Sequence, residues 1–154
     1  MNKRRPYPPA TAAAKSKRPG TEKFVQLARR RWGFTNLGTW VVRDMRGRPG
    51  FLSVHATGRA LDLGYSDRKA ALEAIRWFVD NNGALGVTLV NDYMQGKFGA
   101  TWKCDRQSWK VHEKSELGSR GHWIHVELDA WAADDPVAIE RVWRSLPQPK
   151  NAQA

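Results

Sequence analysis

The sequence contains a single cysteine, Cys104, among its 154 residues. One cysteine excludes an intramolecular disulfide, and it also excludes a zinc site built from several thiolates. A metal ion in this chain must therefore be held by histidine, aspartate and glutamate.

The chain also lacks long apolar runs. No segment approaches the roughly 20 consecutive apolar residues that a membrane-spanning helix needs. The N-terminus is basic, but residues 6–20 contain no continuous apolar stretch of the kind that a signal peptide requires. These absences predict a soluble protein that is made in the cytoplasm and has no membrane span and no export signal of its own.

Acidic residues are scarce. Asp and Glu number 15 against 26 Lys and Arg, which gives a formal net charge of +11 at pH 7. A strongly basic surface favours anionic polymers as partners: nucleic acid, an anionic membrane, or the anionic polymers of a bacterial cell wall. Charge alone does not distinguish among the three.

The length fits one compact domain. Residues 1–20 are rich in Lys, Arg, Pro and Ala and have no hydrophobic periodicity, which predicts a disordered basic tail. Residues 21–146 are predicted to form the folded domain, and residues 147–154 a frayed C-terminus.

Capping residues and hydrophobic periodicity predict a mixture of helices and short strands. The strands are mostly joined as hairpins, which indicates an α+β fold with a central, mostly antiparallel sheet and flanking helices. The eight tryptophans are expected mainly in the core, with Trp123 as a candidate wall of a substrate cleft. The expected helices span 21–32, 66–81 and 135–145, and the expected strands 37–44, 51–55, 59–63, 87–93, 100–104, 109–111 and 122–128.

The segment 53–62 carries the most specific pattern in the chain. It places His55 and Asp62 on either side of Gly58, a residue that lets the backbone turn sharply enough to bring both side chains to one point. A second run, 121–128, adds His122 and His125. Nitrogen and oxygen donors of this kind suit Zn²⁺ and leave room for a water ligand.

The ten residues 53–62 match the pattern S-x-H-x-x-G-x-A-x-D at five specified positions. At average residue usage, a match of this kind arises by chance in about one in 10⁴ chains of this length. The pattern resembles that of the zinc D-Ala-D-Ala carboxypeptidases, the VanY-like and VanX-like peptidases and the phage L-alanyl-D-glutamate endolysins. The resemblance spans residues 39–128 and implies the D-Ala-D-Ala carboxypeptidase/hedgehog-like fold.

The resemblance also implies a set of metal ligands. The second motif of the family ends in a histidine followed two residues later by glutamate, as in His125 and Glu127. By resemblance, Zn²⁺ is bound by His55, Asp62 and His125, with one position open for a water molecule and the scissile carbonyl.

The resemblance is weakest at the general base. Family members usually carry Asp or Glu three residues before the last histidine, and this chain has His122 there. His122 is the first candidate for the base, Glu116 the second and Glu113 the third. A further alternative makes His122 a fourth ligand, which would close the site and favour a structural zinc.

An arginine before the first motif holds the substrate carboxylate or stabilises the oxyanion in the family. Arg43 is our candidate for that role, with Arg46 and Arg48 as competitors. Ser53 is expected to support the site through hydrogen bonds, and Ala60 to allow close packing. His112 lies outside both motifs and is interpreted as an ordinary polar residue.

These features predict a zinc metallopeptidase that cleaves the peptide stem of bacterial peptidoglycan. By analogy with phage endolysins, we expect a monomer that stays in the host cytoplasm until it is released to the cell wall, where its basic surface binds anionic wall polymers. The alternatives are an inactive relative that binds zinc and cell-wall peptides, and a basic nucleic-acid-binding protein; specific nucleic-acid binding is not expected. The stem bond that is cut stays open.

Overall fold

The computed structural model describes residues 2–149 and contains one central sheet. The sheet has six strands in the order β1-β4-β8-β5-β6-β7, and every neighbouring pair is antiparallel. The predicted antiparallel sheet is confirmed. The strands are β1 (Thr35–Gly38), β4 (Ala60–Gly64), β5 (Val87–Asp92), β6 (Ala100–Lys103), β7 (Ser108–Val111) and β8 (Trp123–Leu128).

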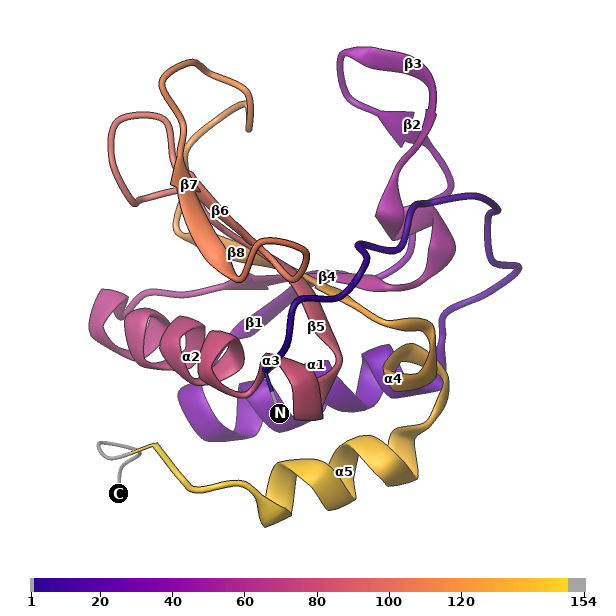
Figure 1. Cartoon of the computed structure of the whole chain (residues 1–154), viewed down its shortest axis with the longest axis vertical. Coiled ribbons are helices and arrows are strands. Elements are labelled where there is room, and N and C mark those ends of the chain that lie inside the picture. The colour runs from indigo at the N-terminus through magenta and orange to yellow at the C-terminus, as the bar shows by residue number, and fades with distance from the viewer. Residues whose placement is uncertain (1, 150–154) are drawn as a thin grey trace.

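The helices gather on one side of this sheet (Figure 1). This arrangement confirms the predicted α+β class. Asp135 caps the last helix by accepting a hydrogen bond from the backbone N–H of Ala138 at 2.9 Å, and Pro136 begins it, as the cap-then-proline pattern predicts. The helices are α1 (Pro19–Trp32), α2 (Arg68–Asp80), α3 (Asn82–Leu85), α4 (Ala130–Asp134) and α5 (Pro136–Ser145).

The core lies between the helices and the sheet. Phe24 of α1 contacts Phe78 of α2 and Trp143 of α5, with ring centroids 5.2 Å apart in both pairs. On β8, Ile124 and Val126 are fully buried against this core. Because side chains alternate along a strand, the residues between them project from the opposite face of the sheet.

The expected strand 37–44 does not form as predicted. Strand β1 ends at Gly38, which has φ 136°, and the side chain of Asn36 accepts the N–H of Gly38 at 2.9 Å in place of a neighbouring strand. The chain therefore leaves the sheet, and Val41 and Val42 are 51% and 57% exposed. It continues into a separate hairpin of β2 (Asp44–Met45) and β3 (Arg48–Leu52).

The N-terminal segment 2–18 differs from the disordered tail that its composition predicts. Figure 1 shows it in indigo, running across the molecule before α1 begins. Arg5 donates to Asp129 at 3.1 Å and to the side chain of Asn82 at 2.8 Å, and Ala14 N–H donates to the carbonyl of Ala56 at 2.8 Å. Specific hydrogen bonds, which composition does not reveal, hold the segment against the domain.

Within residues 2–149, no helix is long and apolar enough to cross a membrane.

Candidate metal centre

His55, Asp62 and His125 come from three different elements. His55 lies on a 3₁₀ helix, Val54–Thr57, which Ser53 caps by accepting the N–H of His55 at 3.3 Å and which ends at Gly58 with φ 74°. Asp62 lies on β4, directly opposite His125 on the neighbouring strand β8. Ser53 and Gly58 of the motif thus build the turn that brings His55 over this pair.

The three side chains converge on one point. Nε2 of His55 lies 3.1 Å from Oδ2 of Asp62, and Nδ1 of His125 lies 2.9 Å from Oδ1 of the same carboxylate. The two imidazole rings are 5.0 Å apart, and one donor atom from each of the three residues falls within 4.8 Å of the others. The structure brings together all three ligands that the sequence predicts.

The donor set fits a zinc ion. Two imidazole nitrogens and one carboxylate oxygen are typical ligands of catalytic zinc, and three protein ligands leave a position open. His55 and His125 are almost fully buried. The group could hold a metal ion at the bottom of a cleft, with the Asp62 side chain 27% exposed.

Glu127 completes the surroundings of His125. Both project from the same face of β8, and Oε2 of Glu127 lies 2.7 Å from Nε2 of His125. Nε2 donates to this carboxylate, so Nδ1 faces Asp62 and the cluster. A ligand histidine that donates its second nitrogen to a carboxylate is the usual arrangement around protein-bound metals.

Charge and hydrogen bonding set the ionisation of the metal-free cluster. Burial opposes the charged form of His125, but its hydrogen bonds to Asp62 and Glu127 outweigh that effect and raise its pKa well above the ordinary value of 6.5. Burial likewise opposes ionisation of Asp62, yet the bonds from His125 and His55 hold the pKa of this carboxyl far below its usual range. The pKa of Glu127 is also lowered, because its bond from His125 outweighs its burial.

Tyr7 of the N-terminal segment joins the same network. Its hydroxyl donates to Oε1 of Glu127, and burial together with the negative charge of Glu127 raises the pKa of the phenol strongly. Arg59 of the first motif donates to the carbonyls of Pro8 and Pro9 at 3.1 and 3.2 Å and keeps this stretch in place. The N-terminal segment is therefore part of the wall of the site.

The cluster lies in a large cleft of about 1130 Å³. In Figure 1 the β2–β3 hairpin rises on one side and strands β6 and β7 on the other, and residues from both sides line the cleft. Trp123 lines it as well, as expected. Four cationic side chains face it: Arg43, Arg46, Arg48 and Lys103.

Two of the three predicted catalytic residues, Arg43 and Glu116, reach this cleft. Arg43 lines it from the loop before β2, where its Nη1 donates to the carbonyl of Asp44 at 3.2 Å. Glu116 lines it from the loop after β7, with its Oε2 atom 2.8 Å from Nδ1 of His112. Among residues 2–149, no hydrogen bond or ion pair joins either side chain to the cluster.

His122 does not reach the cleft. It is exposed just before β8 begins, and its ring packs on Tyr65 with centroids 5.7 Å apart. It lies an odd number of residues from His125, so strand alternation directs it away from the cluster. The structure thus supports neither the base nor the fourth-ligand interpretation of His122.

The sequence interpretation missed several residues of the site. Glu127 was named only as part of the second motif, without a role in the site; that role had a detectable signal, because a residue two positions from His125 on a strand shares its face. Tyr7 had none, since its segment has no periodicity. Asn91 and Thr101 face the cleft from β5 and β6, and His112, interpreted as an ordinary polar residue, is buried beside Thr101.

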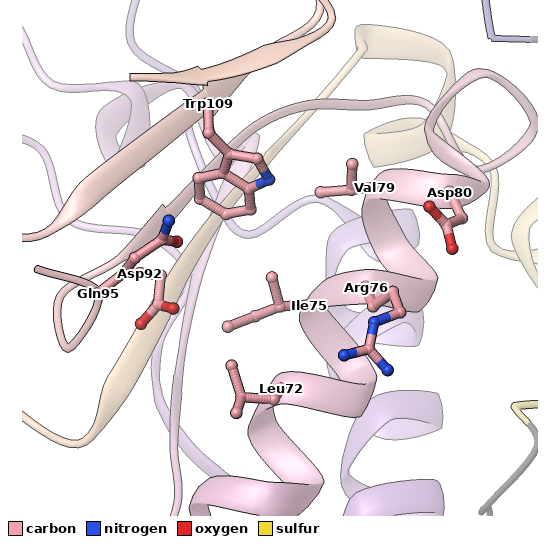
Figure 2. A pocket seen from close by; sticks show the side chains of 8 residues that line it. All are labelled: Leu72, Ile75, Arg76, Val79, Asp80, Asp92, Gln95 and Trp109. Atoms are coloured by element: carbon pink, nitrogen blue, oxygen red, sulfur yellow. The ribbon is translucent and has the colours of Figure 1, made fainter. Parts of the chain in front are cut away.

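A second, smaller pocket of about 220 Å³ lies at α2 (Figure 2). Leu72, Ile75 and Val79 of the helix point toward Trp109 across the pocket, and Asp92 lies on its other side. The Asp92 carboxylate is already paired with Arg68 through two hydrogen bonds of 2.9 and 2.8 Å. Among residues 2–149, the only group of His, Cys, Asp and Glu side chains that could hold a metal ion is the one in the large cleft.

No protein-family model, curated protein or solved structure matches this chain. We therefore infer the function from the geometry of the chain's own residues.

Proposed function

We propose that this protein is a zinc-dependent peptidase that cleaves the peptide stem of bacterial peptidoglycan. The observation that carries the proposal is the convergence of His55, Asp62 and His125 in a large open cleft. Their donor atoms come from two sequence segments more than 60 residues apart along the chain. A donor set of this composition suits zinc with one position left for a substrate or water molecule.

The side chains of the cleft have separate tasks in this proposal. A zinc ion held by three protein ligands polarises a carbonyl group and lowers the pKa of a coordinated water molecule. Glu127 keeps a proton on Nε2 of His125, so that Nδ1 is available as a ligand. The buried 3₁₀ helix fixes His55 through the Ser53 cap.

Glu116 is the proposed proton acceptor. Its Oε2 atom contacts His112 and, at 3.8 Å, Lys110, while Oε1 has no partner within the described part of the chain. The side chain is 48% exposed on a loop beside the cleft, so it can reach toward a bound substrate. Arg43, on the facing wall, is proposed to stabilise the oxyanion.

The cationic wall of the cleft supports an anionic peptide as the substrate. Arg43, Arg46 and Arg48 lie together on one wall, and Lys103 projects from the floor. Peptidoglycan stems carry free carboxylates, which such a wall attracts. The net charge of +11 supports retention on the anionic polymers of the wall as well.

The resemblance to phage endolysins also suggests where the protein acts and in which oligomeric state. In this view it is a monomer that stays in the host cytoplasm until it is released to the cell wall. This part rests on analogy with the family and on the charge of the chain.

One observation favours a second candidate, a catalytically inactive relative that binds zinc and wall peptides. The position where the family usually carries its acidic base holds His122, and that side chain lies outside the cleft. Without proton transfer by Glu116, the chain would bind stem peptides and leave them intact. Cleavage therefore distinguishes the two candidates.

The decisive experiment incubates purified peptidoglycan with the zinc-loaded protein and identifies the released fragments by mass spectrometry. We expect fragments from one stem bond, loss of their release with a chelator, and no release by His55→Ala or Asp62→Ala. Zinc and peptide binding without fragments would instead establish the inactive relative. The masses also identify which bond is cut.

A further inference from the structure

Four polar side chains form one row across the floor of the cleft. Asp62 pairs with His125, His125 pairs with Asn91, and Asn91 pairs with Thr101 on successive strands β4, β8, β5 and β6. Directly opposed residues on antiparallel strands project from the same face of the sheet. Neighbouring strands lie about 4.8 Å apart, so Asn91 stands one step from a metal ligand and Thr101 two steps.

Beyond Thr101 the row continues into a hydrogen-bonded chain behind the floor. The Thr101 hydroxyl donates to Oδ1 of Asn91 at 2.6 Å. The oxygen of this hydroxyl, Oγ1 of Thr101, also lies 2.7 Å from Nε2 of His112. A hydroxyl has one proton, so a bond donated to Asn91 leaves its oxygen to accept from His112. In this arrangement both ring nitrogens of His112 donate: Nε2 to Thr101, and Nδ1 to Oε2 of Glu116 at 2.8 Å.

This chain orients the amide of Asn91. Its carbonyl oxygen is taken by Thr101, so its NH₂ group faces the cleft and donates to no other group among residues 2–149. Asn91 is only partly buried, whereas Thr101 and His112 are 7% and 8% exposed. The arrangement is a fixed hydrogen-bond donor supported by buried groups, which is how a site selects an acceptor on its ligand.

We propose that Asn91 binds a carbonyl or carboxylate oxygen of the substrate peptide within two residues of the reacting bond, and that Thr101 and His112 are positioning residues for it. The distance follows from the spacing of about 4.8 Å between strands and about 3.3 Å per residue of extended peptide. The inference rests on the proposed function in taking a peptide as the ligand. It adds a specificity-determining contact outside both sequence motifs.

The test uses a soluble stem pentapeptide as the probe. Its Kd is measured with the chelator-treated full chain, and its KM and kcat with the zinc-loaded chain. We expect Asn91→Leu to raise Kd and KM about tenfold and Thr101→Val to raise them roughly threefold to tenfold, as for the loss of one hydrogen bond. Both variants should keep kcat and zinc affinity within about twofold.

Two controls separate positioning from general damage. Thr101→Ser keeps the hydroxyl and should restore wild-type affinity. Thr88→Val makes the same change on β5 at a buried hydroxyl that has no hydrogen-bond partner among residues 2–149, and it should leave Kd unchanged. A fall in affinity for Thr88→Val equal to that for Thr101→Val would overturn the positioning role.

The outcomes also separate this inference from the proposed function. Pentapeptide binding that depends on Asn91 without cleavage would reject the peptidase and leave the inference standing. Wild-type Kd in Asn91→Leu, or no binding by the wild-type chain, would reject the inference.

Discussion

The Glu127 carboxylate accepts the Nε2 proton of His125, with 2.7 Å between Oε2 and Nε2, on the same face of strand β8. This contact orients His125 with Nδ1 toward Asp62 and His55. Glu127 thus belongs to the candidate metal centre although it is not one of the three ligands. Its carboxylate also links that centre to Tyr7 near the N-terminus.

Glu127→Gln should weaken zinc binding. The change keeps the size of the side chain but removes the negative charge that holds the imidazole, and loss of such partners typically costs about 10- to 100-fold in metal affinity. Competition titration with a chelating dye measures the effect. Glu140→Gln on α5, which is partly exposed and does not line the cleft, is the matched control and should bind zinc as the wild type does. Equal affinities for both variants would contradict the orienting role of Glu127.

Zinc affinity should rise with pH. In the metal-free chain, burial opposes protonation of His125, but the hydrogen bonds to Asp62 and Glu127 prevail and raise its pKa well above 6.5. Zinc must displace this proton, so apparent affinity should gain up to about tenfold per pH unit below that pKa. Zinc titrations in buffers of different ionisation enthalpy, between about pH 6 and 8, give both affinity and protons released. A flat profile with no proton release would contradict this prediction.

The same shift in pKa affects the stability of the metal-free chain. The pKa of His125 is higher in the folded than in the unfolded state, so its stabilising contribution is full below the unfolded value of about 6.5 and is lost as pH rises through the folded value. Denaturant titrations of the chelator-treated protein should show this loss at alkaline pH. A variant with His125→Gln should lack it.

Arg5→Ala should destabilise the fold. Arg5 bonds to Asp129, to the side chain of Asn82 and to the carbonyl of Val87, which ties the N-terminal segment to α3 and to the start of β5. Hydrogen bonds to charged groups contribute about 1.5–3 kcal/mol, so we expect the free energy of unfolding to fall by about 2 kcal/mol. Urea denaturation measures it.

The neighbouring Arg4→Ala provides the matched control for that experiment. Arg4 is exposed, and its side chain makes no hydrogen bond to any residue from 2 to 149. Its removal should change the free energy of unfolding by less than about 0.5 kcal/mol. If both substitutions lowered the free energy of unfolding by the same small amount, the N-terminal segment would be disordered, as its composition predicts.

His122→Ala should retain zinc and keep kcat within about threefold. Its ring packs on Tyr65 and does not line the cleft, so we expect it neither to bind the metal nor to contact a substrate. Steady-state kinetics on a stem peptide, with zinc content measured in parallel, checks this. Loss of a general base typically costs 10²–10⁴ in rate, so a loss of about 100-fold with zinc retained would make His122 the base after all.

The motifs that carry the family resemblance are local, and the three ligands that the resemblance implies come together in the structure. Ser53, His55 and Gly58 specify one capped turn, and the alternation along β8 directs His125 to the same face as its neighbour two positions on. The capping rule likewise predicts α5 with its true start at Pro136. Each of these features depends on residues within about ten positions of one another.

The remaining features depend on contacts between distant segments. Tyr7 meets Glu127 across 120 positions, and His112 meets Thr101 only because β6 and β7 pair. No local pattern marks either contact. His122 differs from the sequence prediction for a related reason: the family spacing predicts a base at this position, whereas strand alternation directs the side chain away from the cluster.

Zinc content is the most direct test of the central claim, that His55, Asp62 and His125 form a metal site. The wild-type chain and an Asp62→Asn variant are dialysed against the same low zinc concentration. The ratio of zinc to protein is then measured by elemental mass spectrometry. We expect one zinc per wild-type chain and a small fraction of that in the variant. Substantially less than one zinc per wild-type chain, or equal zinc in both, would contradict the claim.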